Sequence, residues 1–181
     1  MRPLPPLRLV VLLAMTLLAT ACSTAPSRDT ASAPLTFIVV RHAEKATDDP
    51  QDPTLSEAGR ARADALAVRL KDAPLVAVYA TEFRRTQQTA RPSADAHGIP
   101  VGAYFARGPA TESAAQWKQA HRAGTVLVVG HSNTVPDLVA ALCRCSVQPM
   151  DDTEYDRLSI VHVDAAGRAT LEVGRYGATA P

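Results

Sequence analysis

The chain has 181 residues, with 19 lysines and arginines against 18 aspartates and glutamates, and 46% of its residues are hydrophobic. This length favours one domain, and the apolar content is sufficient for a buried core. The near balance of charge gives no electrostatic reason to expect nucleic acid or an anionic membrane surface as a partner.

The first 21 residues have the layout of a secretory signal peptide. Arg2 and Arg8 precede an apolar run over residues 9–21, which is too short to span a bilayer comfortably. The end of this run together with the next residue, Leu-Leu-Ala-Thr-Ala-Cys, resembles a lipobox that would make Cys22 the lipidated mature N-terminus, although Ala19 stands where that motif prefers leucine. Ala19-Thr20-Ala21 also fits ordinary cleavage, which leaves open a secreted protein with a free Cys22. We favour a lipoprotein of the periplasm or cell envelope, anchored to the membrane through Cys22.

Residues 22–34 are small, polar and proline-containing, which predicts a flexible tether ahead of a folded domain at 35–181. In that domain, strand-like runs alternate with helix-like runs. Buried strands are expected at 35–40, 75–81 and 125–130, a weaker strand at 99–105, and a closing hairpin from 157–163 and 169–176. Helices are expected at about 54–71, 83–97, 111–123 and 133–143. This order predicts a three-layer α/β/α sandwich with a mostly parallel central sheet.

Four local signals set the expected helix boundaries. Thr54 and Glu57 have the spacing of a capping box, which predicts that Thr54 caps the first helix. Gly124 is expected to end the third helix. Pro92 marks either the first turn of the second helix or a kink, and Pro136 fits the first turn of the fourth.

Cys143 and Cys145 are separated by Arg144 alone, and no further Cys or His with zinc-site spacing accompanies them. The sequence therefore predicts no metal site. Export to an oxidising compartment permits a disulfide between the two. We favour two partly buried thiols at the end of a helix.

Three predicted strands each end in a polar signature. Arg41-His42 follows the first strand, Arg84-Arg85 lies after the second, and His131 follows the third. In parallel sheets, ligand chemistry collects at the carboxyl ends of the strands, so we expect these groups to line one pocket. Arginine donates paired hydrogen bonds to phosphate oxygens, and a neutral histidine can act as a nucleophile. This collection predicts a site for a phosphoryl group.

These signatures together resemble those of the histidine phosphatase superfamily. "RHAE" from Arg41 matches the family's Arg-His-Gly, with Ala43 in place of glycine, "RTQQTA" from Arg85 matches its Arg-x-x-Gln-Thr-Ala segment, and "VVGHSN" matches the strand that delivers its second histidine. The resemblance runs from Leu35 to about Val173. It implies the phosphoglycerate-mutase-like form of the α/β/α fold.

The resemblance also implies a role for each residue. His42 would attack phosphorus and carry the phosphoryl group as a phosphohistidine, while Arg41, Arg85 and His131 would bind the phosphoryl oxygens. Neither a metal nor a cofactor is implied. Arg84 is expected to face solvent or the rim of the pocket.

The acid that protonates the leaving group is less well marked. In the phosphoglycerate-mutase branch, a glutamate lies between the arginine motif and the second histidine, and Glu112 is the only carboxylate from residue 96 to 131. Glu112 is therefore our candidate, with Asp137 and Asp48 as fallbacks. In the acid-phosphatase and phytase branch the residue after the second histidine is aspartate, whereas this chain has Ser132.

From these residues we expect an exported phosphatase that hydrolyses small phosphomonoesters. One alternative is a lipoprotein that keeps the fold and binds a phosphorylated ligand without turnover. Another is a phosphatase of phosphohistidine proteins, a reaction that needs less help from an acid because a protonated imidazole leaves readily. The sequence does not choose a physiological substrate or an oligomeric state.

Overall fold

The computed structural model describes residues 34–179, to which all structural statements refer. The predicted signal peptide and Cys22 lie outside the described residues. The elements alternate along the chain as the sequence predicts. They are β1 (Leu35–Arg41), α1 (Glu57–Leu70), β2 (Leu75–Thr81), α2 (Arg84–Ala96), β3 (Val101–Tyr104), α3 (Ala110–Ala120), β4 (Gly124–Gly130), α4 (Val135–Cys143), β5 (Arg157–Val163) and β6 (Ala169–Arg175).

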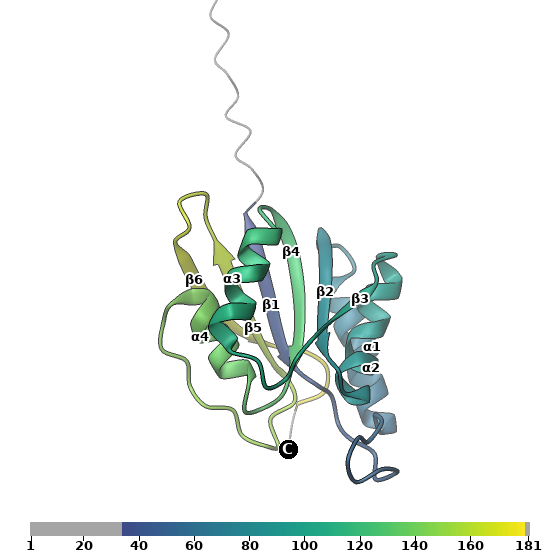
Figure 1. The fold of residues 1–181 in the computed structure, drawn as a ribbon. Coiled ribbons are helices and arrows are strands. Elements are labelled where there is room, and N and C mark those ends of the chain that lie inside the picture. Colours follow the sequence, from purple (N-terminus) through teal and green to yellow (C-terminus); the bar gives the residue numbers. More distant parts are fainter. Residues whose placement is uncertain (1–33, 180–181) are drawn as a thin grey trace, which may run out of the picture. The chain divides into compact units, whose positions relative to one another are not determined.

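The strands form one sheet in the order β3-β2-β4-β1-β5-β6. Strands β1 to β4 are mutually parallel where they pair, while β5 runs antiparallel to β1 and β6 antiparallel to β5. Figure 1 shows β1, β4 and β2 side by side in the middle of the sheet. The predicted α/β fold with a mostly parallel sheet is confirmed.

Both faces of the sheet are covered by helices. Along β1, Phe37 and Val39 face the cluster that includes α3 and α4, whereas Ile38 and Val40 face the cluster that includes α1 and α2. Figure 1 shows the two helix pairs on opposite sides of the sheet. Each such side chain contributes about 1.5–3 kcal/mol through burial, so the strand that carries Arg41 at its end is firmly held.

The first helix starts later than the capping box predicts. Ser56 is the N-cap, because its hydroxyl accepts a hydrogen bond from the Gly59 amide at 3.1 Å. Thr54 instead donates its hydroxyl to Asp48 at 2.7 Å, and Leu55 still pairs with Lys45 as an isolated bridge. The chain is therefore extended at the position where the prediction placed the cap, and that prediction was wrong.

Gly124 begins β4 and does not end the preceding helix, which stops at Ala120. Its φ of 88° belongs to the left-handed region, and a Cβ there would lie 2.6 Å from Cγ1 of Val76. The glycine is thus required where the chain enters the sheet beside β2. In α2, Pro92 lies inside the helix and outside its first turn.

Cys143 and Cys145 form a disulfide, which corrects our expectation of two thiols. Helix α4 ends at Cys143, and Arg144 takes a left-handed φ of 56°. This turn brings the two Cα atoms to 5.2 Å, a separation that a disulfide spans readily. Sequence reasoning could not supply the left-handed turn, because Arg144 is not a residue that favours it.

The loop after β1 is fixed by a buried arginine. Arg62 of α1 is only 4% exposed, and its guanidinium pairs with Glu44 at 2.7 Å while donating to the carbonyl of Tyr176 at 3.0 Å. Gly59 packs so closely on this loop that a Cβ would lie 2.2 Å from the Glu44 carbonyl oxygen. The backbone directly after His42 is therefore held from both sides. Within residues 34–179, no helix has the length and hydropathy needed to cross a bilayer.

Candidate active site

The carboxyl ends of three adjacent strands bring the predicted residues together. Arg41 ends β1 opposite Gly130, which ends β4, and the His42 amide donates to the Gly130 carbonyl at 2.9 Å. His131 follows Gly130, and Thr81 ends β2 on the other side of β4. The expected convergence of the two histidines is confirmed by their rings, whose centroids lie 5.3 Å apart at an interplanar angle of 66°.

His42 is held as a neutral imidazole with a free Nε2. Its Nδ1 lies 2.8 Å from the Ala43 carbonyl oxygen, which can only accept, so Nδ1 carries the hydrogen. Burial, with smaller contributions from the nearby positive charges of Arg41, His131 and Arg85, lowers the pKa of His42 to about 3. The lone pair on Nε2 is therefore available at neutral and mildly acidic pH.

His131 lies beside His42 with a different set of partners. Its Nε2 is 3.0 Å from the Thr81 hydroxyl, and the edge of the Phe83 ring packs against it at 5.3 Å between centroids. Burial, followed by the positive charge of Arg85, lowers the pKa of His131 to about 4. A bound phosphoryl dianion would act in the opposite direction and favour protonation of this ring.

A short chain of hydroxyls orients the His131 ring. The Thr81 hydroxyl lies 2.7 Å from that of Thr86, and both side chains are fully buried. When Thr81 donates to Nε2, the neutral His131 carries its hydrogen on Nδ1, where it can be donated to another group. Sequence analysis did not single out either threonine, although both lie in the segment that carries Arg85.

Arg41 is anchored by backbone groups from a distant loop. Its Nη1 donates to the carbonyls of Asp152 at 2.7 Å and Asp151 at 3.2 Å, and its guanidinium lies 4.1 Å over the Tyr155 ring. The side chain is 4% exposed, and Nε is buried without a hydrogen-bond partner among the described residues. Arg41 thus keeps one buried donor for a ligand.

Arg85 has more unused hydrogen-bonding capacity. Its guanidinium lies 4.4 Å over the Phe83 ring, and Nη1 approaches Asp52 Oδ1 at 3.6 Å, too far for a good hydrogen bond. Nε and Nη1 are both buried with no hydrogen-bond partner in the described part of the chain. Unsatisfied buried donors are costly, so their presence on both arginines points to an anionic ligand with several acceptor oxygens. Neighbouring Arg84 is exposed and pairs with Asp48 at 3.8 Å, as expected for a residue at the rim.

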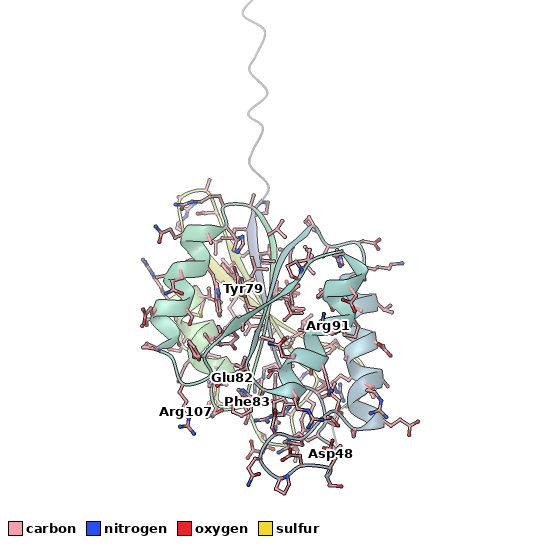
Figure 2. All side chains as sticks on the ribbon, turned by 45° about the vertical axis from the view of Figure 1, so that its right-hand side comes forward. Asp48, Tyr79, Glu82, Phe83, Arg91 and Arg107 are labelled. Carbon is pink, nitrogen blue, oxygen red and sulfur yellow. A yellow bond between two sulfur atoms is a disulfide. The ribbon has the colours of Figure 1, made fainter. Side chains whose placement is uncertain are left out.

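The carboxylates are arranged differently from the sequence expectation. Glu112 is exposed in the first turn of α3, and within residues 34–179 no hydrogen bond or ion pair joins it to His42 or His131. Glu82 directly follows Thr81, and its negative charge opposes the lowering of the His131 pKa. Figure 2 shows Glu82 next to Phe83, beneath the end of the sheet. Sequence analysis missed Glu82, although its place directly after a buried strand was a usable signal.

Ser132 and Asp48, two other polar residues considered for this site, already have partners. Ser132, in the position where the phytase branch has aspartate, donates to Asp152 at 2.7 Å. Asp48 accepts from the amide and hydroxyl of Thr54, and Asp137 lies in the first turn of α4. Across residues 34–179, no group of three or more His, Cys, Asp or Glu side chains is placed to hold a metal ion.

Comparison with known proteins agrees with this geometry. The sequence profile of the histidine phosphatase superfamily, branch 1, matches residues 37–104, a segment that contains Arg41, His42 and Arg85. Residues 37–104 are thus similar to this superfamily. His131 lies beyond the matched segment, so its place in the site comes from the structure. A search by sequence found no matching curated protein.

Several solved structures share the fold over nearly their whole length. The protein histidine phosphatase SixA, solved with tungstate, has a TM-score of 0.62 at 23% identity and covers 77% of this chain and 96% of its own. YhfR of Bacillus stearothermophilus has a TM-score of 0.63 at 21% identity, and the match covers 77% of this chain and 96% of YhfR. A mycobacterial glucosyl-3-phosphoglycerate phosphatase has a TM-score of 0.60 at 17% identity, and the match covers 78% of this chain and 99% of that phosphatase. Identities this low establish the shared fold and leave the substrate open.

Proposed function

We propose that the protein hydrolyses phosphomonoesters through a phosphohistidine on His42. The observation that carries this proposal is the set of buried, unpartnered donors on Arg41 and Arg85 beside a neutral His42. A phosphoryl group supplies the acceptor oxygens that these donors lack. The neutral imidazole supplies the nucleophile.

In the first step, the lone pair on Nε2 of His42 attacks phosphorus and forms an N–P bond. The bond between phosphorus and the ester oxygen breaks, and that oxygen takes up a proton and leaves as the alcohol. Arg41, Arg85 and His131 bind the three equatorial oxygens, whose charge they stabilise in the transition state. In the second step, water attacks phosphorus, the N–P bond breaks, and inorganic phosphate leaves while Nε2 regains its lone pair.

The identity of the acid is part of the proposal. Glu112 remains the candidate suggested by its position in the sequence. Glu82 is the better placed of the two, because its charge acts on His131 and Arg85, and its carboxylate is held by the Ala106 amide at 3.0 Å. We therefore propose Glu82 as the group that protonates an alkoxide leaving group and then activates water.

A second candidate function is hydrolysis of phosphohistidine in proteins. It is favoured by the absence, among residues 34–179, of any carboxylate hydrogen-bonded to His42 or His131. A protonated imidazole leaves without further protonation, so such a substrate needs no enzyme acid. The SixA structure, described as that of a protein histidine phosphatase, has the same fold.

The experiment compares three substrates with the purified protein between about pH 5 and 7: an aryl phosphate, an alkyl phosphate and a phosphohistidine peptide. We expect all turnover to disappear in His42→Ala and to persist in the control His162→Ala, whose ring lies on β5 and contacts Thr36. Activity that survives His42→Ala would remove the nucleophile. Turnover of the phosphohistidine peptide alone would select the second function, and binding of all three without turnover would select a non-catalytic phosphate-binding protein.

We also propose that the mature protein is exported and anchored through Cys22. The support is the residue pattern over 1–22 alone. The mass of the mature N-terminus, measured from a membrane fraction, decides it. A diacylglyceryl cysteine is expected, whereas a free Cys22 would identify a released protein.

A further inference from the structure

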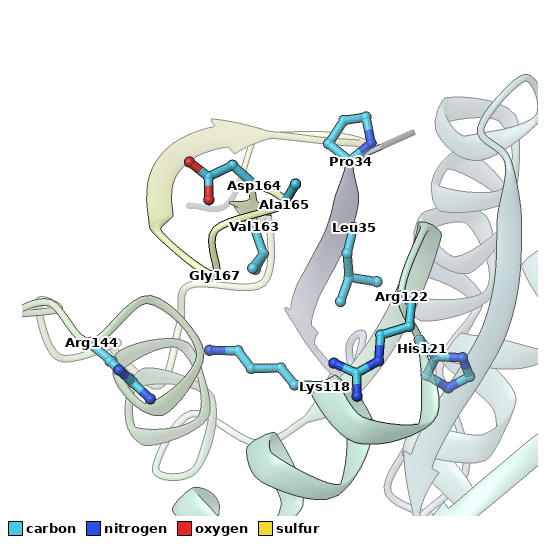
Figure 3. A pocket seen from close by; sticks show the side chains of 10 residues that line it. All are labelled: Pro34, Leu35, Lys118, His121, Arg122, Arg144, Val163, Asp164, Ala165 and Gly167. Carbon is cyan, nitrogen blue, oxygen red and sulfur yellow. The ribbon is translucent and has the colours of Figure 1, made fainter. Parts of the chain in front are cut away.

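A second group of positive charges surrounds a cavity at the opposite end of the sheet. The cavity has a volume of about 270 Å³, and three of its lining residues are Lys118, Arg122 and Arg144. Figure 3 shows Lys118 and Arg122 reaching into the same space, with Arg144 across from them. The start of β1 forms another wall through Leu35. Lys118 and Arg122 are close in sequence, whereas Arg144 follows them by 26 and 22 residues. The fold therefore brings Arg144 to the other two cations.

Among residues 34–179, these three cations have no carboxylate partner. Within residues 34–179, no ion pair involves Lys118, Arg122 or Arg144. The one carboxylate in the wall, Asp164, is paired with Arg168 at 2.8 Å, and Figure 3 shows it turned away from Lys118. The pocket therefore holds three uncompensated positive charges.

The structure holds two of these cations, Lys118 and Arg144, in place although their like charges repel each other. Lys118 donates to the Leu142 carbonyl at 2.5 Å, which fixes its ammonium group at the C-terminal end of α4. Burial, followed by the positive charge of Arg144, lowers the pKa of Lys118, so the two like charges act on each other. The Cys143–Cys145 disulfide encloses Arg144 in its left-handed turn and so fixes where this side chain starts. An anion between them would relieve the repulsion.

The cavity is separate from the catalytic residues. Leu35 lies at one end of β1 and Arg41 at the other, and seven residues of strand place them about 20 Å apart. A phosphoryl group bound to His42 cannot reach this pocket. Any anion held here is a second ligand.

We propose that the pocket formed by Lys118, Arg122 and Arg144 binds a phosphate group carried by a small molecule or a lipid headgroup. Two arginines and a lysine supply the charge and the number of donors that phosphate oxygens accept. The volume is below the range of about 300–1,000 Å³ usual for drug-sized ligands, which favours a small anion or headgroup. Pro34 and Leu35, at the start of the described residues, also line the pocket.

The test follows backbone amide signals of the full chain by nuclear magnetic resonance during titration with inorganic phosphate. The amide signals of Arg144, Ala165 and Gly167 are expected to shift with increasing phosphate until the shifts saturate. The same shifts are expected in His42→Ala, whose catalytic site is disabled. The result that overturns the proposal is saturation confined to amides near Arg41 and His42. Equal shifts at the same concentration of chloride would also overturn it.

Variants give the second readout. The double variant R122E/R144E is expected to raise the dissociation constant for phosphate at these amides at least about 10-fold while leaving aryl phosphate turnover unchanged. The matched control R91E reverses an exposed arginine on α2, which pairs with Asp95 at 3.9 Å, and is expected to change neither property. Unaltered phosphate binding in the double variant would assign the signals to another site. Because turnover is measured separately, failure of this proposal is distinguishable from failure of the catalytic one.

Vesicle binding then separates the two sources of the phosphate group. Flotation of the wild-type chain and the double variant is compared on vesicles of phosphatidylglycerol with phosphatidylcholine and on phosphatidylcholine alone. Weaker binding of the double variant to the phosphatidylglycerol vesicles only supports a lipid headgroup. Equal binding of both proteins, with phosphate binding intact in the wild type, supports a soluble phosphorylated ligand.

Discussion

The two ends of the sheet both collect positive charge, but they hold it in different ways. At the carboxyl end, Arg41 and Arg85 are largely buried, lie on aromatic rings and keep unpartnered donors beside two neutral histidines. At the amino end, Arg122 and Arg144 are exposed to solvent. The same residue type therefore serves two purposes. A desolvated and fixed arginine can stabilise charge that develops during a reaction. An arginine in contact with water can only bind an anion.

The difference follows from how each end is built. At the carboxyl end, Arg41, His42 and His131 are the last residue of a buried strand or lie one position beyond it, and Arg85 lies in the first turn of the helix after β2, so the core determines their positions. At the amino end, Lys118 comes from the last turn of α3, Arg122 from the bend after that helix, and Arg144 from the turn after α4.

The largest effect is expected from removing an arginine whose buried donors have no hydrogen-bond partner among residues 34–179. Arg85→Ala should lower kcat/KM for an aryl phosphate about 10²–10³-fold, because it deletes donors that the transition state uses. Its exposed neighbour provides the matched control, since Arg84→Ala should stay within about 2-fold. Steady-state kinetics on both variants measures the effect. Equal losses in the two would mean that burial does not distinguish them.

Much of this carboxyl end could be predicted from the sequence. A continuous apolar run identifies a buried strand, and the sheet then determines where the next residues lie. Arg41, His42 and His131 were located in this way. The acid was harder to predict from the sequence, because Glu82 and Glu112 are the same residue type and differ only in where their side chains lie. The disulfide required the left-handed turn at Arg144, which composition does not reveal.

The amino-end pocket was also beyond sequence reasoning. Lys118 and Arg144 are separated by a whole strand and helix, and their proximity depends on how α3 packs beside α4. The overall charge balance of the chain gave no reason to expect nucleic acid or an anionic membrane surface as a partner. A local cluster can bind an anion in a nearly neutral protein, because the field near the surface depends on charges within about one Debye length.

The second prediction concerns which carboxylate acts with the buried site. Glu82→Gln should lower alkyl phosphate turnover about 10²-fold and aryl phosphate turnover much less, because phenolates leave with little protonation. Glu112→Gln is the matched control, with a change below about 3-fold expected for either substrate. The ratio of kcat values on the two substrates is the measurement. The reverse pattern would restore Glu112 as the acid and place the site nearer to α3.

A smaller effect is expected from the hydroxyl that orients His131. Thr81→Val keeps the shape of the side chain and removes the hydrogen-bond partner of Nε2, which should lower kcat about 10-fold with little change in KM. Nitrogen chemical shifts of the His131 ring should report a change in which nitrogen is protonated. Thr170→Val, on the exposed face of β6, controls for the substitution itself. An unchanged His131 spectrum together with lower activity would indicate only a packing defect.

The last and smallest effect is on stability, and it tests whether the histidines are truly buried as neutral groups. The pKa of His42 is lowered to about 3 and that of His131 to about 4, mainly by burial, from a usual value near 6.5. Below that usual value the unfolded chain binds protons that the native protein does not, so stability is highest above about pH 6.5 and falls as the pH decreases towards 4. Each histidine contributes at most about 1.4 kcal/mol per pH unit to this slope.

Urea unfolding of the wild type between pH 7 and 5 measures this slope above the range where most carboxylates titrate. The double variant H42N/H131Q should show a clearly shallower decrease, whereas the control His162→Gln, a half-exposed ring on β5, should follow the wild type. Phosphatase activity should not decline as the pH falls through 6.5, because Nε2 of His42 stays unprotonated there. Identical slopes in wild type and double variant would mean that the two rings take up protons in the native state. The carboxyl end would then resemble the solvent-exposed amino end, and the contrast between the two would be lost.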